Sequence, residues 1–449
     1  MVIDFLRQVF AERPQRTAVV WHERQYSYAH LLSRLDHWRT RLAREKVAPG
    51  SVTVLEADFS PEAIALLLAL IEHGTIVVPL TPAVETRKEE FIETARGEVG
   101  FRVDGADEVQ VCRPAFVSDH PLYDELRRRG HPGLVLFSSG TTGRSKAIVH
   151  DVSHLLRKYT TRRHDFTTLA FLLFDHIAGI DTLFYVLANG SCLVTVPDRS
   201  PDTVCRAVER YRVEVLPVSA TFLHLLLLSG AHERYDLSSL RYIAYGSEVM
   251  PESTLKRCAE LFPGVTILQK YGTTEVGTLR SKSESSDSPW VKIGGEGFRT
   301  RVVDGILQIK AHSAMLGYLN APSPFTEDGW FITGDRVEVR GEYMRIHGRD
   351  SDLINVGGEK VFPTEVEDLI LQLDNVADVT VYGEANPITG NIVCADVSLV
   401  RPENEQEFVA RLKRFCREHL QPYKVPIRVS IVDRHRFSQR FKKLRRRQD

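Results

Sequence analysis

The sequence predicts an α/β fold divided into at least two domains. The chain has 449 residues, which is longer than a single hydrophobic core usually supports. Apolar, β-branched runs alternate with amphipathic segments over most of its length, which is typical of parallel sheets covered by helices. We expect a large N-terminal domain with mostly parallel sheets flanked by helices, a small β-rich subdomain, and a small mobile α+β C-terminal domain.

The alternation is clearest in the first half of the chain. Each expected helix lies between two expected strands, and the first of these helices ends at a glycine. Strands are expected at 51–57, 75–80, 134–137, 191–196 and 213–218, and helices at 60–74 and 201–211.

The pattern changes in the last third. Residues 294–349 contain short strands and many glycines, whereas a smaller unit with helices at 363–373 and 403–420 follows from about residue 352. We place the domains at 1–349 and 350–449. The polar stretch SKSESSDSP at 281–289 is expected to be a mobile surface loop.

Composition excludes some functions. Lys plus Arg number 58 and Asp plus Glu number 59, so overall charge gives no reason to expect nucleic-acid binding. The longest apolar run, 63–71, is far below the ~20 residues that a membrane span needs. No signal peptide is visible and the six cysteines form no CxxC pair, so we expect a cytoplasmic protein with reduced thiols.

The segment LVLFSSGTTGRSKAIVH at 134–150 places a glycine- and hydroxyl-rich run directly after a strand. Small residues allow backbone amides to approach an anion, and the hydroxyls and the cations Arg144 and Lys146 suit a polyphosphate. The spacing differs from that of a Walker A loop. A flexible surface turn is the alternative interpretation of this segment alone.

Further motifs follow in a fixed order: AYGSE at 244–248, YGTTE at 271–275, SAMLGYL at 313–319, GWFITGDR ending at Arg336, and GRDSDLINVGGEKVFPTEVE at 348–367. Together with SSGTTGRSK, this set resembles the adenylate-forming superfamily, which comprises acyl-CoA and aryl-CoA synthetases, luciferases and peptide-synthetase adenylation domains. The resemblance covers roughly residues 15–447.

The resemblance implies an acid–thiol ligase. Such an enzyme uses ATP and Mg²⁺ to convert a small carboxylic acid into an acyl-adenylate, and a thiol then displaces AMP. Coenzyme A is the expected acceptor. The phosphopantetheine arm of an acyl carrier protein is the alternative, because it presents the same thiol. A binding module without turnover is a rival from another class.

By resemblance, one group of residues binds ATP. Thr141, Thr142 and Lys146 would contact the β- and γ-phosphates, and Asp335 would accept hydrogen bonds from the ribose with help from Arg349. Tyr271 would stack on adenine. The whole set is Ser138, Ser139, Gly140, Thr141, Thr142, Gly143, Lys146, Gly246, Ser247, Tyr271, Gly272, Thr273, Asp335 and Arg349.

Three residues are implied in catalysis. Thr274 would contact the α-phosphate, and Glu275 would hold Mg²⁺, a cation that prefers carboxylate and phosphate oxygens. The family's C-terminal catalytic lysine aligns with Lys443. Lys442 replaces the usual preceding glycine and remains an alternative, as does a solvated basic tail.

The C-terminal domain of such enzymes rotates between the two half-reactions. Ser351 aligns with the hinge position, where relatives usually carry Asp or Lys. Serine can also absorb a backbone rotation. Gly357 and Gly358 would then approach the thiol.

The acid site is expected around FLLFDHIAGIDTLF at 171–184. An aspartate after Phe174 is typical of enzymes that activate amino acids, whereas His176 and Gly179 fit acyl- and aryl-CoA synthetases; the Ile-Ala-Gly that follows favours a neutral, compact acid. A helix cap is the alternative role of Asp175. The expected lining is Asp175, His176, Gly179, Ser219, Tyr245, Val276 and Gly277.

Overall fold

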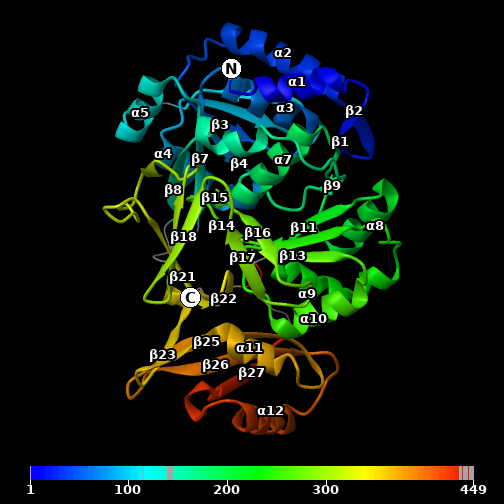
Figure 1. Ribbon diagram of the computed structural model, residues 1–449, viewed down its shortest axis with the longest axis vertical. Coiled ribbons are helices and arrows are strands. Elements are labelled where there is room, and N and C mark those ends of the chain that lie inside the picture. The colour runs from blue at the N-terminus through cyan, green and yellow to red at the C-terminus, as the bar shows by residue number, and fades with distance from the viewer. Residues whose placement is uncertain (1, 115, 139–144, 434–436, 438–442, 444–449) are drawn as a thin grey trace.

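The computed structural model describes residues 2–114, 116–138, 145–433, 437 and 443 (Figure 1). Two seven-stranded sheets form the N-terminal part, a six-stranded sheet follows them, and a five-stranded sheet lies in the C-terminal unit. The α/β class and the division into a large and a small part are confirmed.

The first seven-stranded sheet is parallel at its centre and antiparallel at both edges. In spatial order its strands are β20 (Gly317–Tyr318), β8 (Lys146–Asp151), β7 (Gly133–Ser138), β4 (Ile76–Leu80), β3 (Val52–Glu56), β5 (Val99–Val103) and β6 (Val109–Cys112).

The second sheet is parallel except at β2. Its order is β13 (Thr266–Lys270), β12 (Tyr242–Gly246), β11 (Val215–Ser219), β9 (Thr168–Leu169), β10 (Leu193–Val194), β1 (Thr17–Trp21) and β2 (Arg24–Ser27). The carboxyl ends of β11, β12 and β13 therefore meet along one edge, where the motif residues follow.

Helices cover both sheets. Side chains from the two sheets share one core cluster with α3 and α7, which places these two helices between the sheets. Almost every residue of α3 is buried, as expected for a helix that is apolar all round. The helices of this part are α1 (Asp4–Glu12), α2 (Tyr28–Arg44), α3 (Pro61–Glu72), α4 (Lys88–Ala95), α5 (Pro121–Arg129), α6 (Val152–Leu156), α7 (Ile177–Asn189), α8 (Pro201–Tyr211), α9 (Ala220–Ser229) and α10 (Glu252–Leu261).

The six-stranded sheet is antiparallel and forms the predicted β-rich subdomain. Its strands are β16 (Arg280–Ser283), β17 (Trp290–Gly294), β22 (Tyr343–Arg349), β21 (Phe331–Arg340), β19 (Ile306–Ala311) and β18 (Phe298–Val303). A two-stranded hairpin, β14 (Gly272–Thr273) and β15 (Gly277–Thr278), precedes it.

The C-terminal unit lies at one end of the longest axis (Figure 1, orange to red). It follows β22 after the short 3-10 helix η4 (Asp350–Asp352), so the predicted boundary at 349/350 lies at this junction. It contains β23 (Ile354–Val356), β24 (Glu359–Val361), α11 (Pro363–Ile370), β25 (Val376–Asn386), β26 (Gly390–Leu399), α12 (Glu405–His419) and β27 (Arg428–Ile431).

The polar stretch 281–289 differs from its prediction as a loop, because residues 280–283 form β16. Its serine side chains bond the edge strand β13. Ser286, Ser283 and Ser281 Oγ accept hydrogen bonds of 3.0, 2.9 and 3.1 Å from alternate backbone N–H groups, those of Ile267, Gln269 and Tyr271. Hydroxyl oxygens thus occupy donors that would otherwise face outward from the sheet edge.

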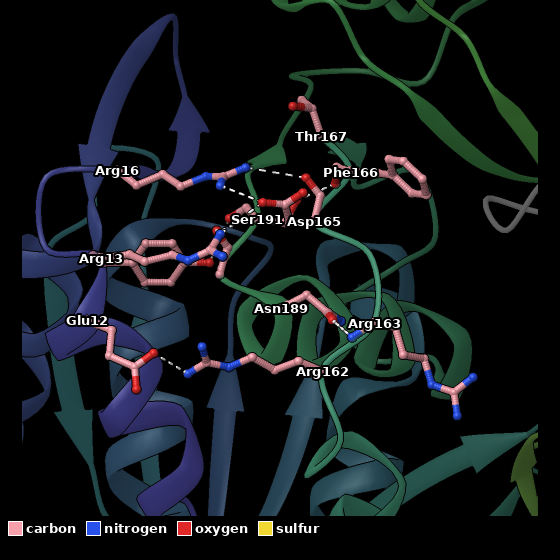
Figure 2. Close-up of polar contacts among 12 residues, drawn as sticks. Glu12, Arg13, Arg16, Arg162, Arg163, Asp165, Phe166, Thr167, Asn189 and Ser191 are labelled. Atoms are coloured by element: carbon pink, nitrogen blue, oxygen red, sulfur yellow. Dashed lines mark hydrogen bonds and ion pairs between the residues drawn. The ribbon is translucent and has the colours of Figure 1, made fainter.

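A polar cluster ties the N-terminal helix to the segment before β9 (Figure 2). Arg13 and Arg16 both donate to Asp165 Oδ2, at 2.9 and 2.7 Å. These guanidinium groups lower the pKa of Asp165, with the hydrogen bond from Arg13 the largest cause. Nearby, Arg162 pairs with Glu12 at 2.6 Å.

No helix in the described part of the chain combines the length and apolar character needed to cross a bilayer.

Candidate active site

The glycine-rich segment connects β7 to β8, whose strands pair from Ser138 opposite Lys146 onward. Ser139, Gly140, Thr141, Thr142 and Gly143 lie outside the described residues. The Lys146 ammonium, on β8, lies 5.0 Å from the centre of the Tyr318 ring. The Tyr318 hydroxyl donates a 2.8 Å hydrogen bond to Glu275 Oε1. The structure thus brings Lys146 and Glu275, which are far apart in sequence, to one tyrosine.

The YGTTE motif forms a tight hairpin. Gly272 pairs with Thr278, and Thr273 pairs with Gly277, so that Thr274 and Glu275 lie within the turn. A Cβ atom on Gly272 would lie 2.8 Å from the Gly277 carbonyl oxygen, which explains the glycine. Gly277 has φ of +81°, in the left-handed region that favours glycine.

His150 supports this turn, although the sequence analysis gave it no role. Its Nε2 lies 2.6 Å from the Thr274 carbonyl oxygen, which can only accept, so the ring donates. The side chain is fully buried at the end of β8, and burial lowers its pKa. A neutral histidine therefore holds the main chain of the motif. A lone histidine on an apolar strand gave no signal of this contact.

Asp335 forms the centre of a second cluster. The Tyr271 hydroxyl donates a 2.5 Å hydrogen bond to Asp335 Oδ2, and Arg349 Nε lies 3.4 Å from Oδ1. Asp335 and Arg349 are opposite each other in the β21–β22 pair. Burial raises the pKa of Asp335, while the charge of Arg349 lowers it. Tyr271 thus has a hydrogen-bond partner, and its stacking on adenine stays a prediction.

The AYGSE motif comprises the last three residues of β12 and the two residues that follow it. A Cβ atom on Gly246 would lie 2.6 Å from the carbonyl oxygen of Lys270 on β13, so the strands approach too closely for a side chain. Ser247 has φ of 71°, a left-handed conformation that is uncommon for serine. Glu248 accepts a 2.6 Å hydrogen bond from the Thr221 hydroxyl on α9. The main chain at Ser247, one of the residues predicted to bind ATP, is therefore held in an unusual conformation.

The start of α7 carries three of the residues predicted for the acid site. His176 caps the helix, its Nδ1 accepting from the Ala178 N–H at 3.3 Å, so the alternative of Asp175 as the cap is wrong. Asp175 is buried and accepts a 3.0 Å hydrogen bond from the Thr81 hydroxyl. A Cβ atom on Gly179 would lie 1.9 Å from the Leu173 carbonyl oxygen, which requires glycine there.

The other predicted lining residues are not all brought together. Val276 and Gly277 lie on the hairpin whose β15 packs against α7. Ser219, in contrast, is fully buried and caps α9, where it accepts from the Phe222 N–H. Tyr245 points into the core of the second sheet, and its hydroxyl lies 3.4 Å from Gln269. Ser219 therefore serves as a helix cap, and Tyr245 as a core side chain.

Comparison with known proteins agrees with the motifs. A family model described as AMP-binding enzyme matches residues 6–305, and a second, AMP-binding enzyme C-terminal domain, matches residues 365–441. The chain belongs to the AMP-binding enzyme family. The resemblance to adenylate-forming ligases, and with it the prediction of an enzyme, is confirmed.

Relatives of this AMP-binding enzyme include an indoleacetate–CoA ligase of Aromatoleum aromaticum, 26% identical, with 94% of this chain and 92% of the relative covered. A 2-succinylbenzoate–CoA ligase of Bacillus licheniformis is 29% identical, with 81% and 77% covered. Among solved structures, the anthranilate CoA ligase AuaEII in complex with anthranoyl-AMP has a TM-score of 0.82 at 19% identity, covering 98% of this chain and 95% of that chain.

In this AMP-binding enzyme, Lys443 lies where the C-terminal unit meets the N-terminal part. Its backbone N–H donates to Glu248 Oε1 at 2.9 Å, beside the AYGSE motif. Its ammonium donates to Asp378 Oδ1 at 2.9 Å and to the Val379 carbonyl oxygen at 2.6 Å. Lys442 lies outside the described residues.

The predicted hinge and thiol-side residues are solvent-exposed. Ser351 lies within η4, directly after β22. Gly357 and Gly358 form the β23–β24 turn with φ of +61° and +95°, and the Gly358 N–H donates to Asn355 Oδ1 at 3.0 Å. A Cβ atom on either glycine would meet no described atom within 4 Å, so backbone conformation, not crowding, favours glycine there.

Proposed function

We propose that this chain activates a small carboxylic acid with ATP, releases pyrophosphate, and transfers the acyl group to the thiol of coenzyme A. The observation that carries the proposal is the position of two carboxylates around one motif. Glu275 lies within the YGTTE turn, and Asp335 is hydrogen-bonded to the tyrosine that begins it. Relatives named as CoA ligases, which match over 94% and 81% of this chain, support the choice of acceptor.

The first step joins a carboxylate oxygen of the acid to the α-phosphorus of ATP. The bond from that phosphorus to the bridging oxygen breaks, and pyrophosphate leaves with the electron pair. Charge develops on phosphoryl oxygens, so positioned cations and hydrogen-bond donors are the main requirement. Lys146, Thr274 and Lys443 supply these groups in our proposal, together with the segment 138–143.

The nucleotide would be bound as its magnesium complex. Glu275 fits this cation, because a carboxylate oxygen is a ligand that Mg²⁺ prefers. Tyr318 occupies only Oε1, and no described residue donates a hydrogen bond to Oε2. When bound, the ion neutralises phosphate charge. Asp335 would accept from the two ribose hydroxyls, since each carboxylate oxygen can accept more than one hydrogen bond.

The second step is attack of the thiolate on the acyl carbon, with AMP as the leaving group. We propose that the C-terminal unit turns at Ser351 between the two steps. Lys443 would serve adenylation, and the Gly357–Gly358 turn would serve thiol transfer. Exposed glycines with positive φ are consistent with a turn that approaches a ligand through its backbone.

Loading of an acyl carrier protein is the alternative, because its phosphopantetheine arm carries the same reacting group. The proposed location of either activity is the cytoplasm, where ATP, coenzyme A and reduced carrier thiols are present.

The test is acid-dependent exchange of labelled pyrophosphate into ATP, with Mg²⁺ and without thiol, across aliphatic, aryl and amino acids. Exchange with one class of acid supports the proposal, and CoA or a carrier protein is then added to identify the acceptor. ATP binding without exchange for any acid would contradict the proposal and favour a binding module.

A further inference from the structure

Helix α10 begins without a cap of its own, because the residue before it is Pro251, which makes no side-chain capping bond. Asp368, on α11 of the C-terminal unit, takes this role. Its Oδ1 accepts from the Ser253 N–H at 3.0 Å and from the Ser253 hydroxyl at 2.7 Å. Ser253 is the second residue of α10, and an N-cap side chain accepts from the N–H at this position. A carboxylate also suits the positive end of a helix. The C-terminal unit therefore caps a helix of the N-terminal part.

The capped helix lies close to a predicted nucleotide-binding motif. Three residues separate the AYGSE motif, which ends at Glu248, from the start of α10. Glu248 accepts from the Thr221 hydroxyl of α9 and from the Lys443 N–H. The same helix α9 contacts the C-terminal unit through His224, which donates to the Ala377 carbonyl oxygen at 3.0 Å. The contacts between the two parts of the chain thus border this motif.

Asp368 and Lys443 are connected through β25. Glu367, the neighbour of Asp368 on α11, is only 2% exposed and accepts a 2.9 Å hydrogen bond from the Val381 N–H on β25. The Lys443 ammonium donates to two earlier residues of the same strand. A movement of Asp368 away from α10 would therefore also move the strand that Lys443 contacts.

The strength of one cap is sufficient to affect such a movement. Both proposed half-reactions occur in every turnover, so the two arrangements of the C-terminal unit must interchange readily. A contact present in only one arrangement shifts their populations by a factor set by its free energy. For one helix cap this factor is about five. Rotation at Ser351, as proposed above, would separate Asp368 from Ser253.

We propose that Asp368 is a positioning residue for adenylation. By capping α10 it holds the C-terminal unit where Lys443 lies beside the AYGSE motif, and it releases Ser253 before thiol transfer. This inference rests on the proposed function.

The test compares the two half-reactions in Asp368→Ala, with an acid that supports pyrophosphate exchange in the wild type. Exchange should fall about fivefold, as expected for the loss of one helix cap. Thioester formation from the supplied acyl-adenylate and CoA should not fall, because that step requires the contact to be released. Asp368→Asn should retain most of the exchange, since asparagine caps helices about as well as aspartate. Ser253→Ala keeps the backbone donor and should show a smaller change in the same direction.

The matched control is Asp374→Ala, which removes an exposed carboxylate shortly after α11 and should change neither half-reaction. ATP affinity and the thermal unfolding midpoint of each variant are measured in parallel. A selective loss of exchange at unchanged ATP affinity supports the inference. A loss of ATP affinity as large as the loss of exchange would show that the cap supports only the AYGSE motif, and would overturn the inference.

The remaining outcomes separate the two proposals. An equal loss of both half-reactions in Asp368→Ala, or no loss of either, would overturn the positioning role and leave the proposed function intact. Exchange with no acid in the wild type would overturn the proposed function, and this inference with it.

Discussion

The Lys443 ammonium is paired with the Asp378 carboxylate at 2.9 Å, within the C-terminal unit and next to the N-terminal Glu248. Their side chains are only 11% and 3% exposed, so salt screens this pair weakly. His224 of the N-terminal α9 approaches the same place, donating to the Ala377 carbonyl oxygen at 3.0 Å. For Lys443 to assist adenylation as proposed, its ammonium must leave Asp378 and contact the reacting groups instead.

Replacing Lys443 with alanine should therefore separate the half-reactions. Pyrophosphate release from ATP and acid is expected to fall about 100-fold or more, because a cation is lost where charge develops. Thioester formation from a supplied acyl-adenylate should remain largely intact. Lys442→Ala is the matched control. A larger defect in that variant would transfer the role to Lys442, and an equal loss of both half-reactions in Lys443→Ala would contradict domain alternation.

Glu275→Gln should lower pyrophosphate exchange about 100-fold and raise the Mg²⁺ concentration needed for half-maximal rate, since a carboxylate is replaced by a neutral amide. Tyr318→Phe removes only the hydrogen bond to Oε1 and should cost about tenfold, consistent with one bond to a charged group. A magnesium titration of the exchange rate distinguishes the two. An unchanged magnesium requirement in Glu275→Gln would remove Glu275 from the proposed metal site.

Asp335 should set the acid limb of ATP binding. Burial raises its pKa, and the ribose requires the ionised carboxylate, so ATP affinity should fall as pH drops through a value above the ordinary range of aspartate. Arg349→Met removes the charge that opposes this shift and should move the limb to higher pH. ATP titrations by calorimetry would measure this pH dependence, from the ordinary aspartate pKa to about four pH units above it. A limb that stays in place would contradict the assignment.

The same shift has a consequence for folding. The folded state binds a proton on Asp335 more tightly than the unfolded state does. Below the ordinary aspartate pKa this carboxyl is protonated in both states, so its raised pKa costs no stability there. The stability cost of ionising the buried carboxyl grows as pH rises from the ordinary aspartate pKa through the raised pKa of Asp335. Asp335→Asn should therefore become more stabilising relative to wild type over this rise, as measured by urea unfolding at each pH.

Gly179→Ala should destabilise the protein by about 1–3 kcal/mol or more, because its Cβ would overlap the Leu173 carbonyl oxygen at 1.9 Å. Chemical denaturation would measure this. Gly105→Ala is the control, since no described atom lies within 4 Å of its Cβ and its φ is not positive. Equal stability of the two variants would mean that the start of α7 can shift without cost.

The sequence predicted elements that have a strong local signal. The helix predicted at 201–211 has the observed bounds of α8, and the one at 60–74 corresponds to α3, which begins after its cap Ser60. The strand predicted at 191–196 is shorter, because only Leu193 and Val194 pair with neighbours. Periodicity reports which residues are buried, whereas pairing depends on strands far away in sequence.

Candidate site residues that share one motif, as in YGTTE, are neighbours along the chain and could be grouped from the sequence. Contacts between distant segments had no such signal. The pairing of Asp175 with Thr81 and the support of Thr274 by His150 both depend on tertiary packing. Tyr245 was misplaced for a related reason, since alternate residues of β12 face opposite sides and only the register decides which faces the core.

The hydroxyls of Ser281, Ser283 and Ser286 also affect how molecules of this chain meet one another. An exposed sheet edge is a template to which a strand of another copy can add, which leads to aggregation. Here the N–H groups of Ile267 and Gln269 in β13, and of Tyr271 directly after it, already have partners within the same chain. The strand β13, which leads into the YGTTE motif, can therefore form the edge of its sheet without adding a strand from another molecule.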